Sequence, residues 1–198
     1  MGRTGLFDLE THFAIYGAYH SNPVNLLLRT FLVWPLVFAV AVLLHFTPSL
    51  YNFPSGLNNH GFELNVGLVL TLMYAIFYVK LDEKAGSLAA LLLFLTWVGA
   101  SVLASGLGFG RSWKLVLAVQ VFCWPALLIG HGVFEKRLPG IADSFVEGFL
   151  MGPYFVLLEF LQSAFSYEPY PGFNKSVKEK IEADIKAWKA IKNQKKLS

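Results

Sequence analysis

Residues 88–105 read LAALLLFLTWVGASVLAS, an unbroken apolar run without an acidic or basic side chain. A helix needs about 20 apolar residues to cross the hydrocarbon core of a bilayer, and this run approaches that length. Three other runs have the same character, namely Thr30–Thr47, Leu64–Val79 and Leu115–Gly130. The sequence therefore predicts four membrane-spanning helices.

The overall composition supports this interpretation. Of the 198 residues, 55% are hydrophobic and 15% are charged, and the mean hydropathy is +0.52. Soluble domains average about 45–50% apolar and about 25% charged residues. Cys123 is the only cysteine, so a disulfide within the chain is excluded. The expected fold class is all-α, a polytopic bundle of helices in a membrane.

A fifth apolar segment, Phe145–Leu161, differs from the other four because it contains Glu147, Pro153 and Glu159. Each carboxylate at the centre of a bilayer costs about 3 kcal/mol on insertion scales. We therefore expect a re-entrant or interfacial helix here. A span buried among its neighbours is the alternative.

The C-terminal part of the chain is basic. Residues 174–198 hold eight lysines and three acidic residues. Apolar residues recur between the lysines at helical spacing, at Val177, Ile181, Ile185, Trp188 and Ile191. This pattern predicts an amphipathic helix, lying either at the membrane interface or against the protein's own membrane face. We expect a membrane domain at residues 1–166 and a linker, basic helix and tail at residues 167–198.

The charges also predict location and orientation. The chain ends Lys195-Lys196-Leu197-Ser198, which resembles the di-lysine retrieval signal of endoplasmic reticulum membrane proteins. Loop 48–63 has no lysine or arginine and loop 80–87 has two, so the former is expected in the lumen and the latter in the cytosol. A cytosolic C-terminus follows if Phe145–Leu161 does not cross the membrane. The anionic cytoplasmic leaflet is the expected partner of the lysines, and no motif favours nucleic acid.

Polar side chains gather at both ends of the membrane block. Residues 19–25 (YHSNPVN) precede the first predicted span, and residues 130–137 (GHGVFEKR) follow the fourth. Ionisable groups so close to lipid are candidates for a functional site. On the expected topology, His20 and His131 lie at the same membrane face. His131 and Glu135 share a helical face, so with His20 they could hold non-haem Fe(II). The alternative is a histidine that simply pairs with Glu135.

Further polar residues near this cluster allow two interpretations each. Lys136 and Arg137 are either cytosolic flanking charges or partners of an anionic substrate. His12 is interpreted as an interfacial or supporting residue rather than a ligand. His45, at a helix end, and His60, in a loop, are expected at the opposite membrane face and are excluded from this site.

Taken together, these stretches resemble a known family. The chain is similar to the 2-hydroxy fatty acid dioxygenases of endoplasmic reticulum membranes in yeast and plants, most of all to plant members. The similar stretches are YHSNPVN, then Val33-Trp34-Pro35, then Gln120 with Cys123-Trp124, and GHGVFEKR. The similarity extends from about residue 4 to residue 190. It includes three more stretches, Leu81–Gly86, Pro153–Glu159 and Tyr167–Phe173.

The resemblance implies an Fe(II)-dependent α-oxidation. A long-chain 2-hydroxy fatty acid from phytosphingosine breakdown would react with O₂ and become an odd-chain acid one carbon shorter. The family's histidines correspond to His20 and His131, which the resemblance makes iron ligands. Asn25, Glu135 and Glu159 are further polar positions that match the family's pattern, and Arg137 is the expected partner of the substrate carboxylate.

Two positions depart from the family's pattern. The family usually has a second histidine nine residues after the first, where this chain has Arg29. An arginine stays protonated and offers no lone pair to iron. The family also commonly has a glutamine where this chain has Leu127. Glu135 or Glu159 could replace the lost ligand.

Three functions are therefore compared. The leading one is the dioxygenase, with His20, His131, Glu135 and Glu159 as candidate metal ligands. Asn25, Lys136 and Arg137 are then its candidate substrate-binding residues. The alternative is a catalytically silent homologue that binds lipid or a membrane partner, which Arg29 and Leu127 favour. A transporter or channel has little support, because the spans show no repeat and almost no charge.

Overall fold

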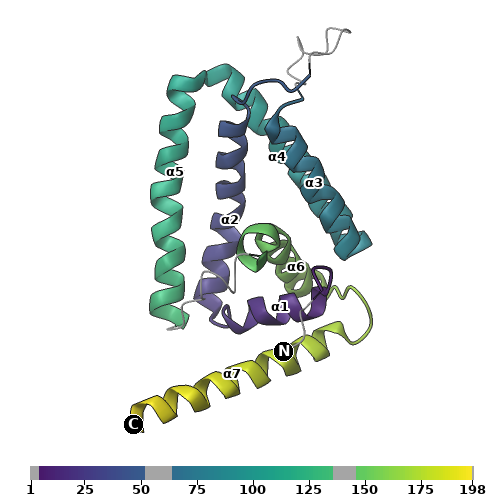
Figure 1. The fold of residues 1–198 in the computed structure, drawn as a ribbon, viewed down its shortest axis with the longest axis vertical. Coiled ribbons are helices and arrows are strands. Elements are labelled where there is room, and N and C mark those ends of the chain that lie inside the picture. Colours follow the sequence, from purple (N-terminus) through teal and green to yellow (C-terminus); the bar gives the residue numbers. More distant parts are fainter. Residues whose placement is uncertain (1–4, 52–63, 136–145, 198) are drawn as a thin grey trace. The chain divides into compact units, whose positions relative to one another are not determined.

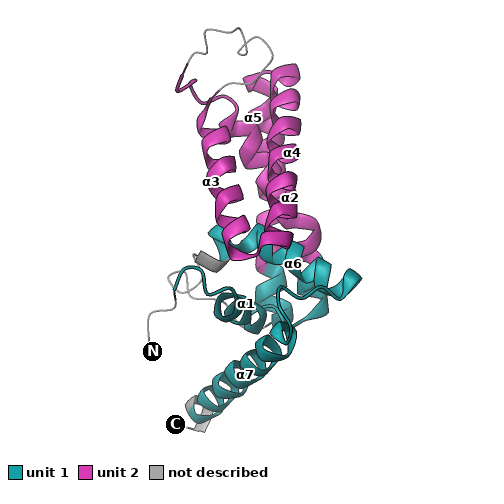
Figure 2. Cartoon of the chain, turned by 90° about the vertical axis from the view of Figure 1, so that its right-hand side faces the viewer, with its two compact units in different colours: residues 1–27, 129–198 teal, residues 28–128 magenta. Residues whose placement is uncertain are grey.

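The computed structural model describes residues 5–51, 64–135 and 146–197, and every regular element in these ranges is a helix. The elements are α1 (Leu9–Ala18), α2 (Pro23–Leu44), α3 (Val66–Leu81), α4 (Glu83–Leu107), α5 (Phe109–Ile129), the π-helical turns η2 (Gly130–Glu135) and η3 (Val146–Leu150), α6 (Gly152–Phe165) and α7 (Phe173–Leu197) (Figure 1). They divide into two compact units, residues 1–27 with 129–198, and residues 28–128 (Figure 2). The expected all-α class is confirmed.

Three of the helices are long and apolar enough to cross a membrane. They are α2, α4 and the continuous helix Phe109–Glu135, which is α5 extended by η2. Helix α3 is also apolar but has only 16 residues. At a rise of about 1.5 Å per residue it spans about 24 Å, less than the roughly 30 Å of a hydrocarbon core. The chain therefore has the helices of a membrane protein, and a fourth crossing by α3 stays a prediction.

Helices α3 and α4 form a tight hairpin within the unit of residues 28–128. Asp82 ends α3 and also caps α4, where its side chain accepts a hydrogen bond from the backbone N–H of Lys84 at 3.0 Å. Gly86 permits the close approach of the two helices, because a Cβ there would lie 2.0 Å from the backbone oxygen of Tyr78. The loop expected at residues 80–87 is therefore reduced to Asp82, because α3 extends to Leu81 and α4 begins at Glu83.

Small side chains make the core of the same unit. Ala39 and Val42 of α2 pack with Ala100 and Ala104 of α4 and with Val116 of α5. Small residues let helix backbones approach closely, which is the usual packing of helices in lipid. Large apolar side chains point outward instead, as at Val102 and Phe122, each 70% exposed. This distribution suits a lipid environment.

In the other unit, α7 packs against α1. Val177 is buried, and a Cβ on Gly17 of α1 would lie 2.5 Å from Cδ1 of Ile181. The carboxylate of Glu10 in α1 forms an ion pair with the Lys180 ammonium at 2.7 Å. It also accepts a hydrogen bond from the Ser176 hydroxyl at 2.5 Å. The expected amphipathic C-terminal helix is therefore present, and its first half packs against the protein itself.

The fifth apolar segment is broken at Met151, between η3 and α6. Helix α6 has 14 residues, a length of about 21 Å. Its residues from Gly152 to Leu158 are all buried. Such a helix is too short to cross a bilayer by itself. Whether the segment is re-entrant or interfacial stays a prediction.

Candidate active site

The end of α1 fixes the ring of His20. Tyr19 caps the helix, and the backbone N–H of His20 donates to the Gly17 carbonyl at 3.1 Å. Nδ1 of His20 lies 2.5 Å from the carbonyl oxygen of Tyr16. Because a carbonyl oxygen can only accept, Nδ1 carries the proton, and Nε2 of the neutral ring carries the lone pair. A backbone carbonyl bonded to one ring nitrogen is a common way of orienting a metal-binding histidine.

His131 lies in η2, directly after α5. Single π-helical turns inside α-helices occur frequently at functional sites. The ring centroids of His20 and His131 are 4.8 Å apart, with the planes inclined at 68°. The expectation that these two histidines meet is therefore confirmed. Their role as metal ligands stays a prediction.

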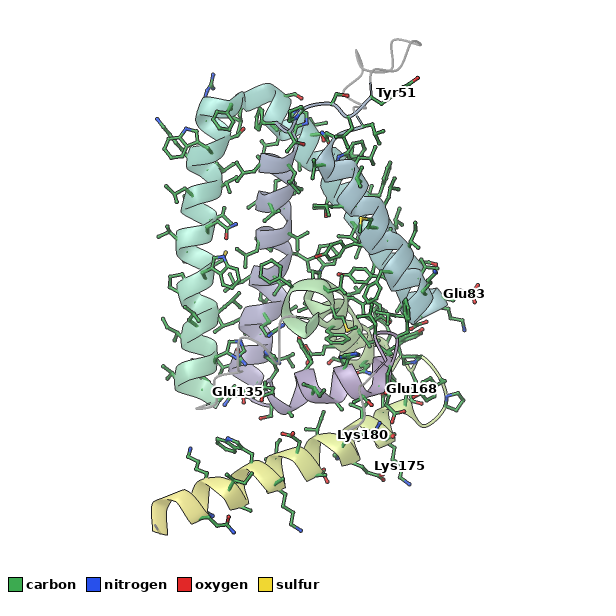
Figure 3. All side chains as sticks on the ribbon, in the orientation of Figure 1. Tyr51, Glu83, Glu135, Glu168, Lys175 and Lys180 are labelled. Carbon is green, nitrogen blue, oxygen red and sulfur yellow. The ribbon has the colours of Figure 1, made fainter. Side chains whose placement is uncertain are left out.

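Glu135, at the end of η2, binds the start of α2. Its Oε1 accepts the backbone N–H of Asn22 at 2.7 Å and the amide Nδ2 of Asn25 at 3.1 Å. Its Oε2 accepts the Ser21 hydroxyl at 3.0 Å. A carboxylate at the N-terminus of a helix satisfies a backbone donor and interacts favourably with the helix dipole. Glu135, which is labelled in Figure 3, therefore joins the two polar stretches that the sequence singled out.

Asn22 and Pro23 explain why α2 begins at this point. The Asn22 side chain accepts the backbone N–H of Val24 at 2.9 Å, which is the bond of a helix N-cap. Pro23 occupies the first helical position, where its missing N–H costs nothing. The sequence Asn22-Pro23 thus starts a new helix three residues after His20.

Glu159, on α6, is connected to His20 through Tyr16. The Tyr16 hydroxyl donates to Glu159 Oε2 at 2.8 Å. The Tyr16 ring lies against the His20 imidazole, with centroids 4.3 Å apart. The structure thus places Glu159 next to the residue that supports His20. Tyr16 is fully buried, at 2% exposure.

Asn25 has a polar atom that the described residues leave unbonded. The side chain is 0% exposed, and its Nδ2 donates to Glu135. Its Oδ1 has no hydrogen-bond partner within residues 5–51, 64–135 and 146–197. A buried acceptor without a partner costs about 1–3 kcal/mol. Such an atom is suited to receive an O–H group from a bound molecule.

Several other residues named from the sequence lie in the unit of residues 28–128 or outside the residues that the structure describes. Lys136, Arg137 and His60 are outside the described residues. Arg29 and Leu127 belong to the unit of residues 28–128 and are buried, at 7% and 8% exposure.

The two further histidines have bonds of their own. His12 is buried and its Nε2 donates to the Gly5 carbonyl at 3.2 Å. His45 lies in the unit of residues 28–128, with Nε2 3.2 Å from the Ser105 hydroxyl. Neither bond involves His20 or His131.

The donor set fits a metal ion in part. Two adjacent imidazoles are typical ligands for iron, zinc or copper. Among the described residues, however, no three His, Cys, Asp or Glu side chains are grouped so that they could hold an ion. Glu135 is hydrogen-bonded to the start of α2, and Glu159 to Tyr16. An ion bound by the two histidines would therefore leave positions for water or for oxygen atoms of a substrate.

Sequence reasoning missed Tyr16, Ser21 and Asn22 as members of this cluster. Tyr16 precedes His20 by one helical turn, a spacing that predicts contact once α1 is recognised as a helix. Asn22-Pro23 is a recognisable N-cap signature. No pattern in the sequence indicates that Glu135 is the acceptor at this cap.

These features define a class, namely an all-helical membrane protein with a polar histidine cluster. Residues 6–164 match the protein family described as 2-hydroxy-palmitic acid dioxygenase Mpo1-like. The chain is also 32% identical over 157 residues to the 2-hydroxy-palmitic acid dioxygenase MPO1 of Saccharomyces cerevisiae, covering 79% of this chain and 82% of the yeast protein. The chain belongs to this family. No solved structure matches it.

Proposed function

We propose that this chain is an Fe(II)-dependent dioxygenase that shortens long-chain 2-hydroxy fatty acids by one carbon, as part of phytosphingosine breakdown. The pair of histidine rings 4.8 Å apart is the observation that carries this proposal. Membership of a family named for a 2-hydroxy-palmitic acid dioxygenase supports it. The reaction balances with O₂ alone: the acid loses its carboxyl carbon as CO₂, its second carbon becomes the new carboxyl group, and water is the other product.

His20 and His131 are the proposed metal ligands. Iron, when bound, would supply the activation of O₂ that an organic side chain cannot provide. The bond from His20 to the Tyr16 carbonyl holds the Nε2 lone pair in a fixed direction. Glu159 supports the same residue through the Tyr16 hydroxyl.

Asn25 is the proposed acceptor for the substrate's 2-hydroxyl group. Its Oδ1 is buried and has no hydrogen-bond partner among the described residues, while its Nδ2 is fixed by Glu135. Lys136 and Arg137 follow Glu135 directly in the sequence. They are the proposed partners of the substrate carboxylate, since charged donors bind carboxylates strongly.

A role in the endoplasmic reticulum membrane follows from the same proposal. The apolar helices would keep the acyl chain in lipid. The terminal Lys195-Lys196 pair would return the protein to that compartment, with its C-terminus in the cytosol.

A second candidate is a catalytically silent homologue that binds lipid or a membrane partner. Arg29 stands where the family usually has a histidine, and an arginine has no lone pair for a metal. The absence of a group of three ligand side chains among the described residues also favours this candidate.

Metal content and product formation separate the two candidates. The full-length protein is purified in detergent, its metal content is measured, and 2-hydroxypalmitate is added with Fe(II) in air. The dioxygenase yields pentadecanoate, and both product and bound iron are lost in His20→Ala and His131→Ala. His45→Ala is the matched control, since His45 bonds to Ser105 instead, and it keeps iron and activity. A folded protein that binds 2-hydroxypalmitate but holds no iron and forms no product is the silent homologue.

Arg29→His tests the departure from the family's pattern. If position 29 is a ligand site, this change raises iron occupancy in the purified protein. Unchanged iron content would show that the position is not a ligand site.

The Asn25→Ala variant is expected to raise KM for the 2-hydroxy acid, measured as product formation against substrate concentration, because the hydroxyl loses its acceptor.

A further inference from the structure

Helix α7 consists of two halves that differ in charge. Residues 173–184 contain three lysines and three acidic residues, so their side-chain charges cancel. Residues 185–198 contain five lysines and no acidic residue. The helix itself is continuous from Phe173 to Leu197.

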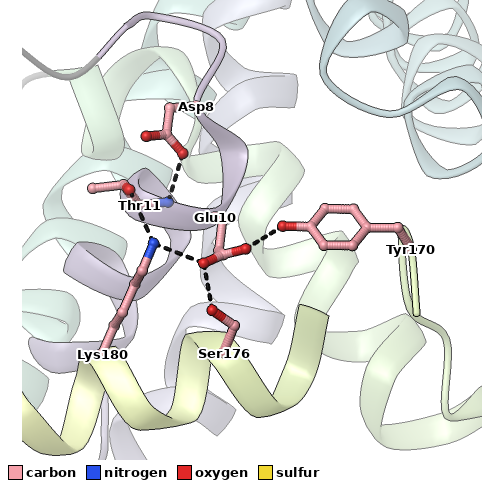
Figure 4. A network of polar contacts seen from close by, with 6 residues as sticks. All are labelled: Asp8, Glu10, Thr11, Tyr170, Ser176 and Lys180. Carbon is pink, nitrogen blue, oxygen red and sulfur yellow. Dashed lines mark hydrogen bonds and ion pairs between the residues drawn. The ribbon is translucent and has the colours of Figure 1, made fainter. Parts of the chain in front are cut away.

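The neutral half is the half that packs on α1. Phe173 and Val177 are buried, at 0% and 5% exposure, and Ile181 lies against Gly17. Glu10 binds Lys180 and Ser176 of α7 as well as the hydroxyl of Tyr170, which precedes the helix (Figure 4). This half is therefore fixed by both apolar and polar contacts.

In the basic half, the side chains of residues 185–194 are exposed or half-buried. Ile191 is 55% exposed. Lys186, Lys189 and Lys192 are exposed on the same two turns. The Lys192 ammonium lies over the Trp188 ring, 4.6 Å from its centroid. Asp184 is the last acidic residue in the sequence. Exposed apolar and cationic side chains thus occur together in a part of α7 that has no acidic residue.

We propose that residues 185–197 of α7 bind the surface of an anionic lipid bilayer, with Ile191 and Trp188 at the level of the headgroups. Lysines near a membrane surface are attracted to anionic lipids, by about fivefold in binding per lysine. Tryptophan is enriched at this depth because its ring is apolar and its N–H is polar. A bilayer is also available to α7, because the same chain carries helices that are long and apolar enough to cross one. An acidic protein would satisfy the lysines but gives no reason for the exposed isoleucine between them.

The test places a polarity-sensitive fluorophore on α7 of the full-length chain in lipid nanodiscs. Cys123→Ala removes the native thiol, and Ile191→Cys or Ala190→Cys receives the label. Position 190 lies on another side of the same turn and serves as the control. Nanodiscs contain phosphatidylcholine alone or phosphatidylcholine with phosphatidylserine, each with and without brominated lipid as a quencher.

We expect a blue shift and quenching by brominated lipid at position 191, but not at position 190, only when phosphatidylserine is present. High salt should reverse both effects. The double variant Lys186→Gln with Lys189→Gln should weaken the phosphatidylserine effect. The lipid fraction needed for the same effect should rise more than tenfold, because each lysine contributes about fivefold to binding. Lys175→Gln with Lys178→Gln, two lysines at the same spacing in the packed half, should leave it unchanged.

Three results would overturn the proposal. The first is equal emission in both lipid compositions, and the second is an equal effect of the two double substitutions. The third is a blue shift that appears on adding soluble polyglutamate but not with phosphatidylserine, which would identify an acidic protein as the partner. Hydrogen exchange in residues 173–181 verifies in each variant that the packed half of α7 is intact.

Discussion

The carboxylate of Glu135 accepts the backbone N–H of Asn22 at 2.7 Å, so the last residue of the helix Phe109–Glu135 binds the N-terminal end of α2. The same carboxylate bonds to Ser21 and Asn25. His20 precedes Asn22 and His131 precedes Glu135 in the sequence, and the two rings meet. The polar cluster is therefore held at the N-terminal end of α2.

Replacing Glu135 should loosen this arrangement. In Glu135→Ala the N–H of Asn22 and the amide of Asn25 lose their acceptor, which costs about 1.5–3 kcal/mol for bonds to a charged group. Thermal unfolding in detergent should show a lower Tm. Glu135→Gln, which keeps one acceptor oxygen, should lose less than Glu135→Ala. Equal Tm values for the wild type and both variants would contradict the assigned role.

The bond between Tyr16 and Glu159 should show coupling in a double-mutant cycle. Tyr16→Phe removes the hydroxyl that donates at 2.8 Å, and Glu159→Gln removes the charge that receives it. Each change alone should cost about 1–2 kcal/mol, and the double variant should cost less than their sum. Unfolding of the four proteins by denaturant gives the coupling energy. Strict additivity would mean that the hydroxyl and the carboxylate do not interact.

The contact between α1 and α7 should weaken in acid. The Lys180 ammonium, with the Ser176 and Tyr170 hydroxyls, lowers the pKa of Glu10 from 4.5 to about 2. A lowered pKa in the folded state means that the contribution to stability is complete above pH 4.5 and is lost as the pH falls to about 2. Glu10→Gln should remove this acid dependence, measured as hydrogen exchange in residues 173–181. The exposed Glu182 gives the matched control, Glu182→Gln, which should keep it.

Deprotonation of Tyr170 should weaken the same contact at high pH. Burial, together with the hydrogen bond to Glu10, raises the pKa of its phenol from 10.0 to about 12. The contribution of this group is therefore present below pH 10 and is lost as the pH rises towards 12. Absorbance of the phenolate in the wild type and in Tyr170→Phe isolates this titration. A midpoint for Tyr170 near 10 would contradict the contact.

Two glycines of α4 should respond oppositely to alanine. A Cβ at Gly86 would lie 2.0 Å from the Tyr78 carbonyl oxygen, which belongs to the backbone and cannot turn away. Gly86→Ala should therefore separate α3 from α4 and cost about 1–3 kcal/mol or more. A Cβ at Gly106 meets nothing within 4 Å, so Gly106→Ala should be neutral or stabilise by up to about 1 kcal/mol. Tm values of the two variants provide the measurement.

The helices could be predicted from the sequence because their signals are local. Apolar runs without charge predicted α2, α4 and α5. The amphipathic stripe predicted α7. The bounds of α3 could not be read from composition: the helix is shifted by two residues from the apolar run Leu64–Val79, because Asn65 caps it and the charged Lys80 lies in its last turn.

The sequence singled out His20, Asn25, His131, Glu135 and Glu159, but the only contact among them that it predicted and the structure shows is the meeting of the two histidines. Their meeting followed from the count of crossings, which places both at one membrane face. The partners of the carboxylates depend on where α1, α6 and η2 pack, and no sequence spacing encodes this. The sequence predicted that Glu135 could share a metal with His131, which stays a prediction, and it did not predict the bonds of Glu135 to Ser21, Asn22 and Asn25. The roles of all these residues in catalysis stay predictions.

The proton on His20 is positioned by main chain and not by a side chain, since its acceptor is the carbonyl of Tyr16. Any amino acid that keeps α1 helical would supply the same carbonyl. Relatives can therefore change the side chain at position 16 without altering which ring nitrogen stays available. The ring orientation of His20 therefore depends on the backbone at the end of α1. A single substitution disturbs it less readily than it disturbs a histidine ring that is oriented by a carboxylate side chain.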